Sequence, residues 1–226
     1  MTTSHAPFRD RHHAGRVLAE QLESHRNKEG LLVLALPRGG VAVGFEVARA
    51  LRAPLDIFVV RKLGLPGNEE YAIGAIASGG VCVMNSLANE VMGPEALSKV
   101  IARERAELER RELLYRRKRP AVPVRGRHVI VVDDGLATGS TMRAAVQAIR
   151  KQHPAYLTVA VPVGAQDTTE SLRDVADEVV CVVALSPFRA VSLWYQDFPQ
   201  ASDDEVCSLL EEAHRQHELD PPPAVL

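Results

Sequence analysis

The chain has 226 residues, of which 46% are apolar, enough to bury one substantial α/β core with an appendage. Its formal net charge of −2 gives no overall attraction to nucleic acid or to a membrane surface. The amino-terminal stretch lacks the apolar centre of a signal peptide, and no apolar run approaches the ~18 residues of a membrane span. Three well-separated cysteines, Cys82, Cys181 and Cys207, fit reduced thiols. We therefore expect a single domain over residues 1–226, located in the cytoplasm.

An amphipathic helix is predicted within residues 8–30, where Val17, Leu18 and Leu22 have helical spacing and Gly30 could end the helix. The nearby histidines could suggest a metal site. Adjacent histidines on a helix point to different faces, however, so a solvated helix start is the better interpretation.

A short apolar strand, Leu31 to Leu36, runs directly into a turn with the sequence Pro-Arg-Gly-Gly, and a helical pattern follows from Val41 to Leu51. Glycine allows the backbone to approach a ligand closely, and Arg38 offers a bidentate fork to phosphate oxygens. The turn is a candidate anion site, although the motif alone would also suit an ordinary strand-to-helix connection.

A second strand, Leu55 to Val60, is expected to deliver Arg61 and Lys62 at its end, where two cations suit a pyrophosphate. The segment Leu63 to Glu70 is rich in glycine and proline and predicts a mobile loop. It could be a lid over a site or a plain surface loop.

Residues 61–126 have the pattern of an insertion made of this lid, a hairpin and a long helix. The hairpin is predicted from Ala72–Ala77 and Val81–Asn85 around a glycine turn, and the helix from Pro94 to Arg119. Lys99 to Arg119 holds nine basic and four acidic residues. We expect its last turn to be a solvated helix end, with contact to nucleic acid as a weaker alternative.

The most informative stretch is VIVVDDGLATGST, which begins at Val129. Its β-branched run predicts a buried strand of a parallel sheet, and Asp133 and Asp134 follow where that strand ends. The small, hydroxyl-rich turn then opens into a helix near Thr141, whose amino end favours a phosphate. Because two carboxylates would repel that phosphate, they are expected to bind sugar hydroxyls or a divalent metal.

Helices and strands alternate through the rest of the chain. A helix over Met142–Lys151, a strand over Ala155–Val161, a helix over Asp167–Val175 and a strand over Val179–Leu185 predict an α/β fold with a doubly wound, mostly parallel sheet. Ligands bind such sheets at the carboxyl edge, where Arg38, Arg61, Lys62 and Asp133 are expected to converge.

Aromatic side chains gather in the segment Ser186 to Gln200, although they make up only 4% of the whole chain. This segment and a last helix over Asp203–Glu212 would form a carboxyl-terminal hood over residues 186–216. Its rings could stack on a ligand, seal the sheet or form a dimer contact. His214 and His217 lack partners at zinc-ligand spacing. Residues 218–226 are expected to be disordered.

The central stretch closely resembles the signature that binds 5-phosphoribosyl-1-pyrophosphate (PRPP) in type I phosphoribosyltransferases. The resemblance implies that family's doubly wound fold with a small hood. It also implies that the Pro-Arg-Gly-Gly turn binds pyrophosphate, often through a cis peptide, which Pro37 would make less costly. The implied PRPP-binding residues are Pro37, Arg38, Gly39, Gly40, Asp133, Asp134, Gly135, Ala137, Thr138, Gly139, Ser140 and Thr141.

The implied reaction joins a nitrogenous base to C1 of PRPP and releases pyrophosphate. Mg²⁺ would be held by Asp133 and Asp134, partly through PRPP, and the implied catalytic residues are Arg38, Arg61, Lys62, Asp133 and Asp134. The implied partners are PRPP and a small base or nucleotide, without membrane or nucleic acid, and we expect a homodimer.

The motif is most similar to adenine-type enzymes, because Ala137 stands where hypoxanthine-type relatives carry an acid. The chain also resembles a group of bacterial phosphoribosyltransferases of unassigned substrate, in which the LPRGG turn, the RKLG-PGN loop, the DDGLATG-TM motif and the WY-DF tail recur. The expected base-binding residues are Phe188, Trp194, Tyr195, Glu69 and Glu70, and Glu69 or Glu70 would serve as the general base. Two alternatives stay open. One is a regulator that senses PRPP or a nucleotide without turnover, contacting nucleic acid through the basic helix. The other is a phosphoribosyl-binding scaffold.

Overall fold

The computed structural model describes residues 8–65, 68–84, 93–117 and 119–219, with residues 68–72 described by their backbone alone. A five-stranded parallel sheet has the order β2-β1-β6-β7-β8, and an antiparallel sheet has the order β3-β4-β5. The fold is therefore α/β with a mostly parallel main sheet, as predicted. The strands are β1 (Leu31–Ala35), β2 (Leu55–Ile57), β3 (Val60–Leu65), β4 (Asn68–Ala77), β5 (Val81–Met84), β6 (His128–Val132), β7 (Tyr156–Ala165) and β8 (Glu178–Leu185). The helices are α1 (Arg11–Gln21), η1 (Glu23–His25), α2 (Gly40–Leu51), α4 (Pro94–Arg116), α5 (Ser140–Arg150), α6 (Gln166–Leu172), η2 (Val191–Trp194) and α7 (Asp203–Leu219).

The central strand β6 shows why the main sheet forms. Val129 and Val131 pack on the side of α5 and α6, while Ile130 and Val132 pack on the side of α1 and α2. All four side chains are fully buried, and each contributes about 1.5–3 kcal/mol by leaving water. An apolar run is therefore required here, because both faces of a central parallel strand are covered.

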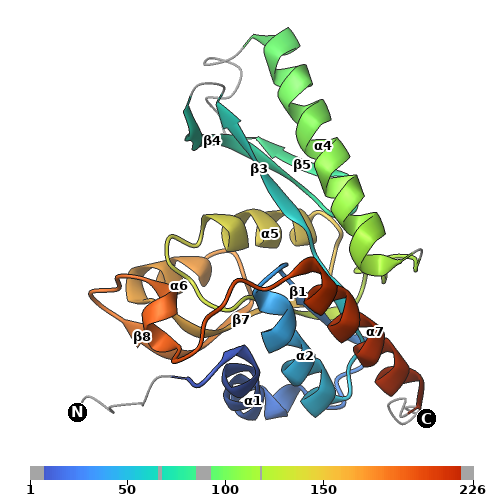
Figure 1. Cartoon of the computed structure of the whole chain (residues 1–226), viewed down its shortest axis with the longest axis vertical. Coiled ribbons are helices and arrows are strands. Elements are labelled where there is room, and N and C mark those ends of the chain that lie inside the picture. The colour runs from blue at the N-terminus through green and yellow to red at the C-terminus, as the bar shows by residue number, and fades with distance from the viewer. Residues whose placement is uncertain (1–7, 66–67, 85–92, 118, 220–226) are drawn as a thin grey trace.

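The antiparallel sheet stands away from the main sheet, next to α5, and α4 packs along it (Figure 1). Figure 1 also shows α7 lying beside α2, so the carboxyl-terminal helix returns to the main body. The predicted hairpin is confirmed, since β4 pairs with β5 around Gly79 and Gly80. Residues 61–126 thus contain a projecting arm between two strands of the main sheet.

Two predictions in the first part of the chain are wrong. The first helix ends at Gln21, and Gly30 lies in a left-handed turn before β1 instead of ending the helix. The expected mobile loop over Leu63–Glu70 is mostly strand, because β3 and β4 pair with one another. The pairing of β3 with β4 shifts register on both sides of Gly64, because a glycine backbone tolerates an irregularity within a strand. Residues 66 and 67 lie outside the described residues.

The strand expected over Leu55–Val60 is also shorter than predicted. It ends at Ile57, so Arg61 and Lys62 lie within β3 of the antiparallel sheet and not at the carboxyl edge of the main sheet. The disordered tail expected over residues 218–226 is also wrong at its start, because α7 continues through Glu218 and Leu219. Residues 220–226 lie outside the described residues.

The end of α4 differs most from its predicted environment. Arg116 is buried, and its Nε donates to Asp56 Oδ1 over 2.9 Å while Nη2 donates to the carbonyl of Ile57 over 2.9 Å. Asp56 Oδ2 also accepts from the backbone of Val122. The expected solvated helix end is wrong at this residue, because a buried carboxylate of the main body neutralises it.

Candidate functional site

Two acids lie directly after β6, at the carboxyl edge of the main sheet. Asp133 Oδ1 accepts a hydrogen bond from the backbone N–H of Asp134 over 2.9 Å. Burial raises the pKa of Asp133 well above its ordinary value, and the adjacent charge of Asp134 raises it further. Burial also raises the pKa of Asp134, although Arg11 counteracts this by hydrogen bonding and by its charge. Two carboxylates so close and so buried need cations or hydroxyl donors to remain charged.

The Pro-Arg-Gly-Gly turn packs directly against these acids. A Cβ atom on Gly39 would lie 2.0 Å from Asp134 Oδ2, and one on Gly40 would lie 2.8 Å from the carbonyl oxygen of Val132. Only glycine permits such an approach, so the two turns form one continuous surface. The Pro37–Arg38 peptide bond is cis. The cis bond therefore follows Pro37, instead of preceding it as the proline suggested.

The turn before α5 leaves polar groups open at the amino end of the helix. Gly139 has a φ of +67°, and a Cβ there would meet Thr168 Cγ2 at 2.4 Å. Thr138 Oγ1 and Ser140 Oγ lie 3.3 Å apart on the exposed side of the turn. Among the described residues, no side chain caps the amino end of α5. Backbone N–H groups and two hydroxyls are therefore available to a phosphate.

The predicted cations are placed differently from one another. Arg38 lies near this edge, with Nη1 at 3.9 Å from Asp203 Oδ1 at the start of α7. Arg61 instead donates to Glu104 Oε2 of α4, through Nη2 at 2.6 Å and Nε at 2.9 Å. Lys62 lines a cavity of about 580 Å³, together with Ser140 from the phosphate turn. The structure thus places Arg38 at this edge and Lys62 in a cavity that extends from Ser140 along α5, while Arg61 pairs within the arm.

The aromatic segment contributes in an unexpected way. Tyr195 is buried, and its hydroxyl donates to the backbone carbonyl of Asp134 over 2.6 Å. Its ring therefore supports the acids and presents no open face to a base, contrary to its predicted role. Phe188 and Trp194 pack in a partly buried cluster with Phe8. Both are less enclosed than Tyr195 and stay candidates for base contact.

The other predicted base-binding residues, Glu69 and Glu70, lie in β4, and their side chains are outside the described residues. Ala137 is exposed, and its carbonyl accepts from the hydroxyl of Thr168. It supplies no acid to the turn, in keeping with the adenine-type pattern.

Arg11 is a site residue that sequence reasoning missed. Its Nε donates to Asp134 Oδ2 over 2.8 Å, although the two residues are 123 positions apart. Its guanidinium lies 3.7 Å above the ring of Phe198, and Nη1 donates to the carbonyl of Pro199 over 2.7 Å. No motif spacing connects the first helix to the central acids, so only the folded chain shows this contact.

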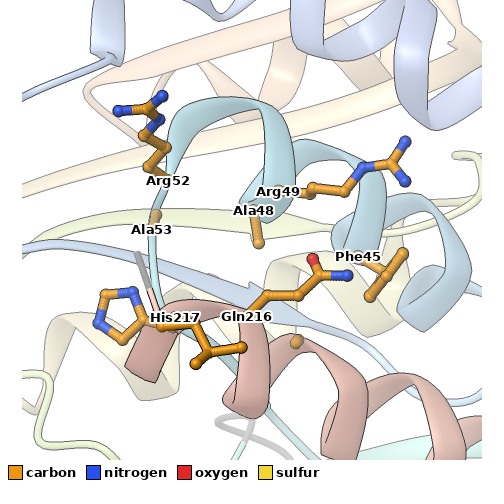
Figure 2. A pocket seen from close by; sticks show the side chains of 9 residues that line it. Phe45, Ala48, Arg49, Arg52, Ala53, Gln216 and His217 are labelled. Atoms are coloured by element: carbon orange, nitrogen blue, oxygen red, sulfur yellow. The ribbon is translucent and has the colours of Figure 1, made fainter. Parts of the chain in front are cut away.

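A second cavity, of about 300 Å³, lies away from the acids. Figure 2 shows Phe45, Ala48 and Ala53, from α2 and the residues after it, across from Gln216 and His217 of α7. It lies near the carboxyl ends of both helices, whereas the Pro-Arg-Gly-Gly turn precedes the amino end of α2. This cavity and the Pro-Arg-Gly-Gly turn are thus at opposite ends of α2.

Neither a metal cluster nor a membrane helix is found in the described ranges. No group of three or more histidine, cysteine, aspartate or glutamate residues there could hold a metal ion. Likewise, no described helix is long and apolar enough to cross a membrane.

Comparison with known proteins agrees with this geometry. A family model of the phosphoribosyl transferase domain matches residues 10–196, and the chain belongs to this family. Two Mycobacterium tuberculosis proteins, from strains CDC 1551 and H37Rv, are named as candidate phosphoribosyl transferases. Each is 45% identical over 210 residues, which cover 92% of this chain and 47% of the relative. The chain therefore spans about half the length of these curated relatives.

One solved structure is similar to this chain over almost the whole length of that structure. The crystal structure of TT1426 from Thermus thermophilus is 43% identical, with a TM-score of 0.82. The similarity covers 91% of this chain and 98% of that one. The arm and the main sheet of this chain thus have a counterpart in a solved protein of nearly the same extent.

Proposed function

We propose that the protein transfers a 5-phosphoribosyl group from Mg·PRPP to a nitrogenous base and releases pyrophosphate. The observation that carries this proposal is the contact between the two turns, in which Gly39 lies against the carboxylate of Asp134. A ligand that spans this junction would present ribose hydroxyls to the acids and its pyrophosphate to the Pro-Arg-Gly-Gly turn. PRPP has this arrangement of groups, and the family of the chain supports the choice.

Each part of PRPP has a chemically suitable partner. The hydroxyls and backbone N–H groups of Thr138–Thr141 suit the 5′-phosphate. Asp133 Oδ2 and Asp134 Oδ1 accept no hydrogen bond from another residue in the described part of the chain, so each acid keeps one oxygen for a ribose hydroxyl. Arg38 and the open backbone of Gly39 and Gly40 suit the pyrophosphate.

The reaction we propose breaks the bond between C1 and the pyrophosphate oxygen, and the bonding electrons leave with pyrophosphate. A nitrogen lone pair of the base then forms the new bond to C1, and the proton carried by the base passes to the departing pyrophosphate or to water. Positive charge develops on the ribose and negative charge on the leaving group, so the main task of the site is electrostatic. The two acids would stabilise the ribose, and Arg38 would stabilise the leaving group.

A divalent cation fits the same place. Asp133 and Asp134 are hard oxygen ligands, and because burial raises the pKa of both carboxyls, a bound cation would stabilise their charged forms. Mg²⁺ bound together with PRPP would act as this cation and neutralise the pyrophosphate.

The proposal of a regulator that contacts nucleic acid receives less support from the basic helix. Arg103, Arg110 and Arg111 pair with acids of α4 itself. Arg116 pairs with Asp56, and Arg117 pairs with Glu211 of α7. Its charges are therefore largely balanced within the chain. Lys118 lies outside the described residues, and the expected homodimer stays a prediction.

A screen for pyrophosphate release tests turnover. The full chain would be incubated with Mg·PRPP and, one at a time, purines, pyrimidines and small heterocycles. We expect release above the rate without a base for at least one class, and loss of that release with Asp134→Asn. Binding of Mg·PRPP without release for any base would overturn the transferase proposal in favour of a sensor.

A further inference from the structure

Arg11 connects three parts of the chain at the carboxylate of Asp134. It comes from the first turn of α1, reaches the acid after β6 through Nε, and reaches the carbonyl of Pro199 in the aromatic segment through Nη1. The guanidinium also stacks on Phe198. Its side chain is only 11% exposed, so the arginine is enclosed by these contacts.

The oxygen that Arg11 holds is the one that contacts the pyrophosphate turn. A Cβ on Gly39 would come within 2.0 Å of Asp134 Oδ2 and 3.2 Å of Arg11 Nε. Asp134 Oδ2 is therefore confined between an arginine and a glycine backbone. The backbone of Asp134 is fixed separately, because its N–H donates to Asp133 and its carbonyl accepts from Tyr195. With one oxygen confined, the direction of the other is set as well.

We propose that Arg11 is a positioning residue, which orients the carboxylate of Asp134 so that Oδ1 faces the ribose hydroxyls of PRPP. This inference rests on the proposed function. A direct contact of Arg11 with the ligand is less consistent with the structure, because its guanidinium is already engaged by Asp134, Pro199 and Phe198. Because Arg11 is already ordered before the ligand binds, binding costs less conformational entropy.

The arrangement predicts which ligand groups depend on Arg11. Ribose hydroxyls would lose affinity when the carboxylate is free to rotate. Inorganic pyrophosphate without Mg²⁺ has neither hydroxyls nor a metal for the acids to bind, so it would bind at the turn without using Asp134. A loss confined to ligands that contain ribose therefore distinguishes positioning from general damage to the site.

The test uses calorimetry of the full chain with PRPP and, separately, with pyrophosphate, both without Mg²⁺, because Mg²⁺ would itself bind Asp134. Variants are Arg11→Met, which retains an apolar chain against Phe198, Asp134→Asn, and the double variant. Arg16→Met is the matched control, because Arg16 lies on the same helix but pairs with Glu46. We expect Arg11→Met to weaken PRPP about tenfold and pyrophosphate less than twofold, as one charge-assisted hydrogen bond is lost. The control should match the wild type within twofold.

The double variant decides whether Arg11 acts through Asp134. If it does, the double variant should be no more than about twofold weaker than Asp134→Asn alone, because the oriented group is already lost. Effects that multiply, or an equal loss of pyrophosphate affinity in Arg11→Met, would overturn the inference.

A crystal structure of Arg11→Met without ligand provides a readout that does not depend on PRPP. We expect the Asp134 carboxylate to be rotated or to occupy more than one conformation. An unchanged carboxylate would overturn the positioning role even if PRPP binds. Failure of the wild type to bind Mg·PRPP would instead reject the proposed function, and a displaced carboxylate would then show that Arg11 orients Asp134 but not for PRPP.

Discussion

The substitution Gly39→Ala tests the contact between the two turns most sharply. The backbone of Gly39 is right-handed helical, with φ −58° and ψ −37°, so alanine is permitted there and only the added methyl matters. That methyl would lie 2.0 Å from Asp134 Oδ2 and 2.7 Å from its Cγ. Cβ contacts in real proteins essentially never fall below 3.0 Å, so the carboxylate or the turn must move.

The magnitude follows from what resists the movement. Asp134 cannot simply rotate, because Arg11 Nε holds Oδ2 at 2.8 Å, and that charge-assisted hydrogen bond contributes about 1.5–3 kcal/mol. Overpacking of this kind costs about 1–3 kcal/mol. We therefore expect the free energy of unfolding to fall by about 1–3 kcal/mol and the affinity for Mg·PRPP to fall about tenfold or more.

Urea unfolding and calorimetry with Mg·PRPP measure the two effects. The matched control is Gly93→Ala, because Gly93 has an ordinary φ of −64° and a Cβ there would meet no atom of the described residues within 4 Å. Its unfolding free energy and affinity should stay close to those of the wild type. If Gly39→Ala behaves like this control in both assays, the contact between the turns has no energetic role and the reasoning is refuted.

Two further predictions concern stability, and both are measured by urea unfolding. Arg116→Leu should lower the free energy of unfolding by about 3–5 kcal/mol, because it leaves the buried carboxylate of Asp56 without its partner. The control Arg117→Ala breaks an exposed pair with Glu211 and should lower it by less than about 1 kcal/mol. Equal losses for the two variants would contradict the burial argument. Burial lowers the pKa of the His128 imidazole below 6.5. The folded protein therefore binds a proton at His128 less readily than the unfolded chain does, and the stability contributed by neutral His128 is lost as the pH falls below about 6.5. His128→Gln should therefore reduce the loss of stability between pH 7.5 and 5.5, and an unchanged loss would show that other groups cause it.

The sequence predicts the main sheet well because its signals are local. The β-branched run at Val129–Val132 and the alternation of strands with helices depend on residues close together in the chain. The turns at Gly39 and Gly139 were also predictable, since glycine next to a strand end indicates close backbone approach. Each of these features is set by a few neighbouring residues.

The errors concern contacts between distant parts of the chain. Local charge predicts a solvated end for α4, but Arg116 is buried by a carboxylate 60 positions earlier. Similarly, Arg61 pairs with Glu104, 43 positions later. Glycine and proline in the Leu63–Glu70 segment suggested a loop, whereas pairing between β3 and β4 produced strand. In each case a tertiary partner overrides the local pattern, and one sequence alone does not identify that partner.

Calorimetric titration of the full chain with Mg·PRPP tests the central claim most directly. We predict saturable binding of one ligand per chain at concentrations below ~1 mM, within the usual range for enzyme substrates. Asp134→Asn should weaken it about tenfold or more, whereas Asp174→Asn, a change at an exposed residue, should leave it within twofold. No heat of binding with the wild type, or equal effects of the two substitutions, would contradict the claim that the acids after β6 bind the ribose of PRPP.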